Sequence, residues 1–105
     1  LLLVSAGYDG HADDPLGAMR LSDNAYRVFT RKARRLAEQV CGGKVVATLE
    51  GGYDVEALGR SVVGFLEEMV ADEVGDTETL PEDAHPAIGE LIDEIRKLHE
   101  PHWKL

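Results

Sequence analysis

Two short runs of apolar residues, 1–6 and 44–50, decide what this chain can fold into. Each run is nearly continuous, which is typical of a strand that is buried on both faces of a sheet. A glycine-containing turn follows each run, and a helical pattern follows each turn. Strands that alternate with helices in this order pair in parallel through a right-handed crossover. The sequence therefore predicts an α/β fold with a strand, helix, strand, helix order.

The helix boundaries are marked by capping residues. Ser22 or Asp23 can cap the first helix. Gly42 and Gly43 end that helix, and Asp54 can cap the second one. The apolar residues of the first helix fall on one face: Tyr26, Phe29, Ala33, Leu36, Ala37 and Val40. We expect its charged residues on the other faces: Arg27, Arg31, Arg34, Arg35 and Glu38.

The chain divides into three segments. Residues 1–71 form the βαβα portion, residues 72–83 are acidic and unpatterned and predict a loop, and residues 84–105 predict a C-terminal helix and tail. Pro86 suits the first turn of this third helix, and Pro101 stops it. A chain of 105 residues is at most one domain. Because it opens without Met inside a strand pattern, we expect it to be cut from a longer domain.

The charge is strongly negative and uneven. The net charge is −9, which argues against nucleic acid as a partner, since duplex binding depends on Lys and Arg. Residues 67–100 hold 12 acidic residues and only two basic ones. This acidic surface is either simply solvated or a surface that attracts basic protein tails.

Composition also bears on compartment and assembly. No apolar run approaches the roughly 20 residues that span a bilayer, so no membrane partner is expected. The single cysteine, Cys41, fits a reducing compartment, and we expect a cytoplasmic protein. Two buried-type strands also leave sheet edges uncovered, and uncovered edges associate. We expect either missing sequence or a second copy of the chain, as a homo-oligomer, to cover them.

Two polar side chains follow the predicted strands, at the sheet edge where parallel sheets bind ligands. Asp9 offers a carboxylate that could hold a metal or cap the following turn. Tyr53 offers a phenol that is protonated at neutral pH and can donate a hydrogen bond. Gly51 and Gly52 would let the backbone come close to a substrate. A phosphate cradle there is disfavoured, because the G-x-G-x-x-G spacing is absent and Asp54 would repel an anion.

Three motifs carry a family resemblance. Residues 5–9 read Ser-Ala-Gly-Tyr-Asp, residues 14–17 read Asp-Pro-Leu-Gly, and residues 50–54 read Glu-Gly-Gly-Tyr-Asp. Over residues 1–71 the chain resembles the histone deacetylase superfamily, including acetylpolyamine amidohydrolases and acetoin-utilisation-type proteins. The resemblance implies part of a three-layer αβα arginase/deacetylase fold. It also implies zinc-dependent hydrolysis of acetyl-lysine or acetyl-amine amides.

The same resemblance implies roles for single residues. Asp9 would be a zinc ligand, Tyr53 would stabilise the oxyanion, and Leu16 would line the tunnel that holds the acylated lysine. Gly51 and Gly52 would bind substrate through their backbone. The family's other metal ligands and its histidine pair would lie upstream, so we expect this chain to be inactive alone and to bind zinc weakly.

Three further residues of the first loop have simpler expected roles. His11 is expected to be a loop histidine near the pocket rim rather than a metal ligand. Asp14 is expected to fix its loop by binding backbone amides, and Asp13 to be solvated. The alternative function is a non-catalytic α/β binding module or a self-associating structural module.

Overall fold

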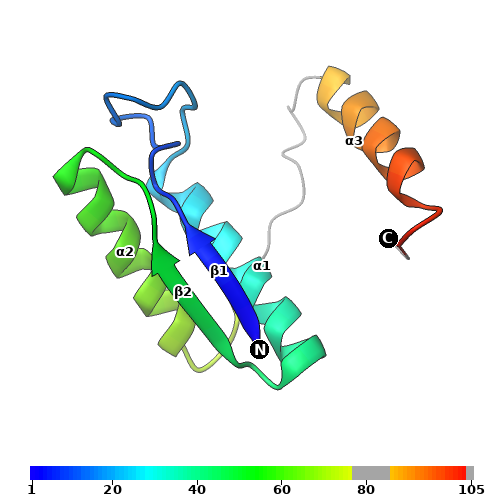
Figure 1. The fold of residues 1–105 in the computed structure, drawn as a ribbon, viewed down its shortest axis with the longest axis horizontal. Coiled ribbons are helices and arrows are strands. Elements are labelled where there is room, and N and C mark those ends of the chain that lie inside the picture. Colours follow the sequence, from blue (N-terminus) through cyan, green and yellow to red (C-terminus); the bar gives the residue numbers. More distant parts are fainter. Residues whose placement is uncertain (77–85, 104–105) are drawn as a thin grey trace.

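A computed structural model describes residues 1–76 and 86–103. Its elements are β1 (Leu2–Ala6), α1 (Asp23–Cys41), β2 (Val45–Leu49), α2 (Val55–Val70) and α3 (Pro86–His99) (Figure 1). The strands pair in parallel, with a register that runs from Leu2 opposite Val45 to Ala6 opposite Leu49. The predicted order of strands and helices and the α/β class are confirmed.

The helix ends follow from local chemistry. The Ser22 hydroxyl accepts a hydrogen bond from the Ala25 amide at 3.3 Å and caps α1. Gly42 ends α1 in the left-handed conformation, with φ of 63°. The Asp54 carboxylate accepts from the Ala57 amide at 2.7 Å and caps α2.

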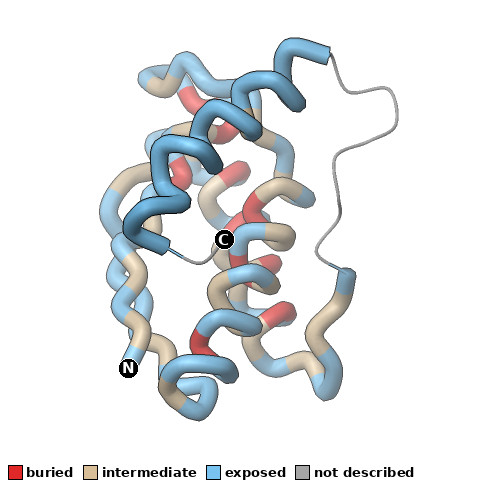
Figure 2. The backbone as a smooth tube through the Cα atoms, turned by 90° about the vertical axis from the view of Figure 1, so that its right-hand side faces the viewer, coloured by how far each residue is buried: buried red, intermediate tan, exposed pale blue. Residues whose placement is uncertain are grey.

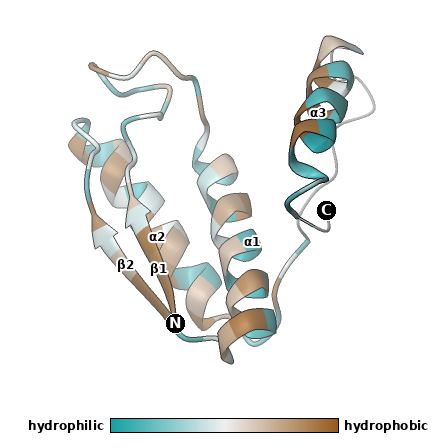
Figure 3. Cartoon of the chain, turned by 45° about the vertical axis from the view of Figure 1, so that its right-hand side comes forward, coloured by the Kyte–Doolittle hydropathy of each residue, from teal (hydrophilic) through white to brown (hydrophobic). Residues whose placement is uncertain are grey.

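Helices α1 and α2 pack against each other on one face of the sheet (Figures 1 and 3). Exposure along β1 alternates, and Leu3 is 70% exposed while its neighbour across the sheet, Val46, is 48% exposed. The prediction that both strand faces are buried is therefore wrong for the described residues. The cause is that α1 and α2 both lie on the same side. Figure 2 shows that the buried residues lie mainly in α1, α2 and the loop after β1.

Charged residues hold the two helices together. Glu68 of α2 is buried and accepts hydrogen bonds from Arg31, at 2.7 and 2.8 Å, and from Arg27 at 3.2 Å. Arg34 donates to the carbonyl oxygens of Glu68 and Ala71, both at 2.8 Å. These arginines therefore face α2, and the sequence pattern did not predict that a charged face of α1 packs against another helix.

Small residues let this charged contact form. The residues of α2 that are buried beside Glu68 are Ala57, Ser61 and Gly64. A Cβ added at Gly64 would lie 3.1 Å from the Arg27 guanidinium nitrogen Nε. The helices thus approach through a small-residue surface while the arginine stems lie along it.

Helix α3 begins at Pro86, as predicted, and none of its residues is buried. Its apolar stripe is largely exposed: Ile88, Leu91, Ile95 and Leu98. Most of the acidic loop, residues 77–83, lies outside the described residues, so the three-segment division stays a prediction. Within residues 1–76 and 86–103, no helix combines the length and apolarity needed to cross a bilayer.

Glu68 should make stability depend on acid pH. The hydrogen bonds from Arg31, and then those from Arg27, lower the pKa of Glu68 below its ordinary value. A carboxylate whose pKa is lower in the folded state than in the unfolded state stabilises the fold at pH values above its ordinary pKa. This stabilisation is lost as the pH falls through the folded-state pKa. In the natural protein that contains this sequence, we expect Glu68→Gln to cost about 1–3 kcal/mol at neutral pH. Thermal unfolding from neutral to acid pH should show a smaller decline for this variant than for wild type.

The matched control is Glu67→Gln, because Glu67 pairs with Arg27 but its side chain is 58% exposed. It should change stability by less than about 1 kcal/mol. Equal effects of the two substitutions at every pH would contradict a central role for Glu68.

Candidate functional site

The loops after the two strands lie side by side. The strand ladder continues past the sheet, since the Tyr8 amide donates to the Gly51 carbonyl at 2.8 Å and the Glu50 amide donates to the Ala6 carbonyl at 3.0 Å. Both loops leave the same end of the sheet (Figure 1). In parallel sheets this carboxyl edge is the usual place for a ligand.

Asp9 sits in a cradle made by two glycines. A Cβ added at Gly51 would lie 2.8 Å from the Asp9 carboxylate oxygen Oδ1, and one added at Gly7 would lie 2.9 Å from it. These distances are too short for real side chains, so the carboxylate fills the space that side chains would take. The two loops therefore meet at Asp9.

The Asp9 carboxylate is available to a cation. Asp9 is exposed, and its carboxylate accepts no hydrogen bond within residues 1–76 and 86–103. A carboxylate oxygen is a suitable zinc ligand, so this residue fits the metal that the resemblance implies. Among the described residues, no group of three His, Cys, Asp or Glu side chains could hold a metal ion together. Residues 1–76 and 86–103 thus offer one candidate ligand and no complete metal site.

His11 is hydrogen-bonded through one ring nitrogen only, and its other ring nitrogen is buried without a hydrogen-bond partner in the described residues. It is buried, its Nδ1 accepts from the Asp13 amide at 3.0 Å, and its Nε2 lies 3.2 Å from the Asp23 carboxylate. The Asp23 carboxylate is close to Nε2 but forms no hydrogen bond with it. The His11 ring also stacks on Tyr26, with the ring centroids 6.3 Å apart, and whether His11 binds a metal stays a prediction.

Asp14 connects the two loops. Its Oδ1 accepts from the amides of Leu16 and Gly17, both at 2.9 Å, and its Oδ2 accepts from the Tyr53 amide at 2.7 Å. These hydrogen bonds, the one from Tyr53 above all, lower the pKa of Asp14. The bonds within the loop agree with the sequence-based expectation. The bond to Tyr53 was not predicted, because no local pattern pairs residues 39 positions apart.

Asp13 is not simply solvated. Its carboxylate pairs with Arg60 of α2 at 3.0 Å, and Arg60 also bonds Asp23 at 3.1 Å. The hydrogen bonds that Arg60 donates to Asp23, followed by its pair with Asp13, raise the pKa of Arg60. Adjacent aspartates of the first loop therefore each bind a different part of the second strand–helix unit.

The remaining predicted site residues lie at the surface of these loops. The Tyr53 side chain is 58% exposed, and Leu16 is 71% exposed. Gly52 has φ of +131°, and a Cβ there would lie 3.1 Å from the Cβ of Tyr8. The turn before Tyr53 therefore requires glycine both for its backbone conformation and for its close approach to the first loop.

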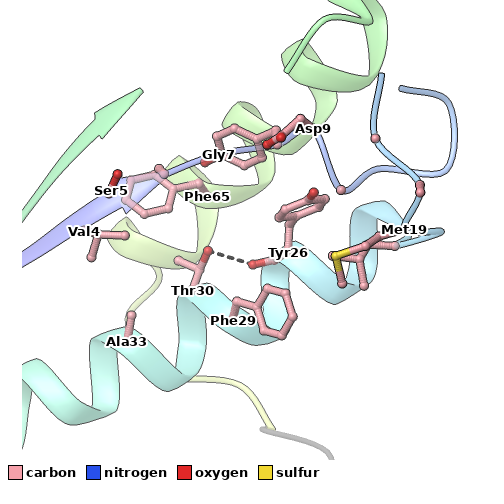
Figure 4. A pocket seen from close by; sticks show the side chains of 16 residues that line it. Val4, Ser5, Gly7, Asp9, Met19, Tyr26, Phe29, Thr30, Ala33 and Phe65 are labelled. Atoms are coloured by element: carbon pink, nitrogen blue, oxygen red, sulfur yellow. Dashed lines mark hydrogen bonds between the residues drawn. The ribbon is translucent and has the colours of Figure 1, made fainter. Parts of the chain in front are cut away.

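A cavity of about 520 Å³ lies next to Asp9, between β1 and the two helices (Figure 4). Its walls are mostly apolar and include Val4, Phe29 and Phe65. The Tyr26 hydroxyl is buried there without a hydrogen-bond partner in the described part of the chain. Burial, followed by the nearby Asp9 charge, raises the pKa of Tyr26. The cavity is therefore mostly apolar, with Asp9 among the residues that line it.

Comparison with known proteins identifies the family. The family model described as the histone deacetylase domain matches residues 1–69. The chain belongs to the histone deacetylase family. Among its relatives is histone deacetylase 10, chloroplastic, of Oryza sativa subsp. japonica, which is 38% identical over 94% of this chain. Another is the polyamine deacetylase HDAC10 of Homo sapiens, which is 34% identical over 99% of this chain.

The fold of this chain also matches that of a solved histone deacetylase structure. The histone deacetylase Clr3 superposes on 99% of this chain with a TM-score of 0.75 and 27% identity. The chain covers 16% of that structure, 24% of the rice relative and 15% of the human relative. It therefore spans a quarter or less of the length of these histone deacetylases.

Gly17 should be needed to keep Asp9 in place. A Cβ added at Gly17 would lie 1.6 Å from the Asp9 carbonyl oxygen, so a side chain must push one loop segment off the other. We expect Gly17→Ala to destabilise the natural protein by about 1–3 kcal/mol. Thermal unfolding of the purified protein measures this effect.

Gly59 supplies the control, because nothing lies within 4 Å of a Cβ added there, in the middle of α2. Gly59→Ala should stabilise the helix by about 0.5–1 kcal/mol. A Gly17→Ala protein as stable as the Gly59→Ala protein would show that the contact with Asp9 is not needed.

Proposed function

We propose that this chain provides part of the active site of a zinc-dependent deacetylase that hydrolyses acetyl-lysine or acetyl-amine amides. The observation that supports this most is the exposed Asp9 carboxylate, cradled by Gly7 and Gly51 and without a hydrogen-bond partner in the described residues. The turn that presents Tyr53 packs against the same loop. Membership of the histone deacetylase family supports the reaction class.

In this proposal Asp9 is one ligand of the zinc ion. Zinc, when bound, would polarise the amide carbonyl and activate water. The Tyr53 hydroxyl would donate a hydrogen bond to the oxygen on which negative charge develops. Gly51 and Gly52 would let the backbone approach the substrate, and Leu16 would contact the methylene stem of an acylated lysine. The exposure of Leu16 and Tyr53 leaves both side chains accessible to a substrate.

The remaining catalytic groups would come from outside these 105 residues. Catalytic zinc usually takes three protein ligands, and among the described residues, which hold no group of three potential ligands, Asp9 is our candidate. We therefore propose that an N-terminal part of the domain supplies the other ligands and a histidine pair. The chain alone would bind zinc weakly and be inactive.

The two substrate classes both remain in this proposal. The human relative is named a polyamine deacetylase and the rice relative a histone deacetylase. An apolar residue at Leu16 favours the acylated lysine, since a carboxylate would suit a cationic polyamine better. The cytoplasmic location stays a prediction, and the rice relative is named as chloroplastic.

Replacing Tyr53 tests the proposal directly. In the natural protein, Tyr53→Phe should lower kcat about 100- to 1,000-fold, because one oxyanion donor is worth about 2.7–4 kcal/mol. KM and zinc content should change little, since the ring and the metal ligand remain. Steady-state kinetics on an acetyl-lysine peptide measures this. Tyr8→Phe is the control and should leave kcat within a few-fold of wild type; a similarly active Tyr53→Phe enzyme would remove Tyr53 from the mechanism.

Leu16→Glu should change substrate preference. A carboxylate at a partly desolvated tunnel mouth attracts a distant ammonium group and removes apolar surface from the stem of a peptide lysine. We expect the ratio of kcat/KM for acetylpolyamine over acetyl-lysine peptide to rise about tenfold at low salt. The rise should shrink with added salt, because a mouth position is screened. An unchanged ratio at low salt would mean that Leu16 does not face the substrate.

A second proposal is that the chain acts as a self-associating module. The open sheet face, with Leu3 and Val46 exposed, supports it. We expect light scattering of the 105-residue chain to show a mass that rises with concentration, and Leu3→Lys to shift it toward the monomer. Ser5→Lys, on the same face but replacing a polar residue, should do so less. A stable monomer at all concentrations would argue against this proposal.

A further inference from the structure

We propose that Asp14 is a positioning residue that holds the Asp9 loop and the Tyr53 turn at a fixed separation. This inference rests on the proposed function, in which Asp9 binds metal and Tyr53 stabilises the oxyanion. Its basis is that one buried carboxylate bonds both loops, with one oxygen on each.

The bond to the second loop fixes the backbone of Tyr53. Asp14 Oδ2 accepts from the Tyr53 amide at 2.7 Å, a short distance for a charge-assisted hydrogen bond. The next residue, Asp54, caps α2. The backbone of Tyr53 is therefore held between the Asp14 carboxylate and the start of a helix.

The other oxygen connects Asp14 to Asp9. Asp14 Oδ1 accepts from the Leu16 and Gly17 amides at 2.9 Å, which closes the loop into a tight turn. The backbone of Gly17 then packs directly on the Asp9 carbonyl, where an added Cβ would lie 1.6 Å from the oxygen. One path from Asp9 to Tyr53 thus runs through Gly17 and the Asp14 carboxylate, in addition to the contacts that both loops make at Gly51.

The environment of Asp14 makes this connection rigid. Asp14 is only 8% exposed, so water cannot easily replace its partners. The amide bonds lower its pKa, which keeps the carboxylate ionised and accepting at neutral pH. An asparagine has the same shape but turns one of the two acceptors into a donor, which would face an amide N–H.

The neighbouring Asp13 differs in each of these respects. Its side chain is 58% exposed, and it pairs with the Arg60 side chain rather than with the backbone of the Tyr53 turn. Loss of this pair should cost little, as for other exposed ion pairs. Asp13→Asn is therefore a matched control for Asp14→Asn.

The kinetic test is a double-mutant cycle in the natural zinc-loaded protein. Because a displacement of about 1 Å can cost about 100-fold, we expect Asp14→Asn to lower kcat 10- to 100-fold with KM within threefold. Asp13→Asn should stay within twofold of wild type. If Asp14 acts through Tyr53, adding Asp14→Asn to Tyr53→Phe should lower kcat less than about threefold further. Full multiplication of the two effects would overturn the inference.

Hydrogen exchange tests the same contact without activity. In wild type, the Tyr53 amide should exchange at least tenfold more slowly than an exposed loop amide, and Asp14→Asn should remove most of that protection. Fast exchange of this amide in wild type would overturn the inference, even if the variant fails to fold.

If Tyr53→Phe is fully active while the Tyr53 amide is protected, the proposed function fails and the contact stands. If Tyr53→Phe is slow but Asp14→Asn is not, the inference alone fails.

Discussion

The in-register parallel pairing of β1 and β2 is the constraint on which the rest of this structure depends. The register sets Ala6 opposite Leu49, so the two strands end together and their loops leave the sheet side by side. The amides of Tyr8 and Glu50 extend the pairing into those loops. A one-residue slip would turn every strand side chain to the other face and move Asp9 out of the Gly51 cradle.

Two buried carboxylates connect elements that lie far apart in the sequence. Glu68 joins the two helices through Arg27 and Arg31, and Asp14 joins the two strand-end loops through backbone amides. Both groups are buried and both have lowered pKa values for the same reason, since hydrogen bonds favour the charged form. Stability and site geometry therefore depend on a few fully bonded charges as well as on apolar packing.

Sequence patterns predicted the order of elements, the caps at Asp54 and Gly42 and the placing of Asp9 at a strand end. Those features are local, because each depends on residues a few positions apart. The patterns did not predict the hydrogen bond between Asp14 and the Tyr53 amide. They also did not predict the ion pairs of Asp13 with Arg60 and of Glu68 with the arginines of α1, because the partners lie far apart in the sequence. The patterns also predicted that both faces of each strand are buried. An apolar run does not reveal whether the helices of this chain cover one face of the sheet or both.

The central claim is that Asp9 and Tyr53 face one metal ion. Diffraction at the zinc absorption edge from crystals of the natural, zinc-loaded protein tests it most directly. The account predicts an anomalous peak about 2.0–2.2 Å from an Asp9 carboxylate oxygen. It also predicts the Tyr53 hydroxyl on the same side of that peak as a bound acetyl-lysine analogue. A zinc ion bound without Asp9, or a Tyr53 side chain turned away from the analogue, would contradict it.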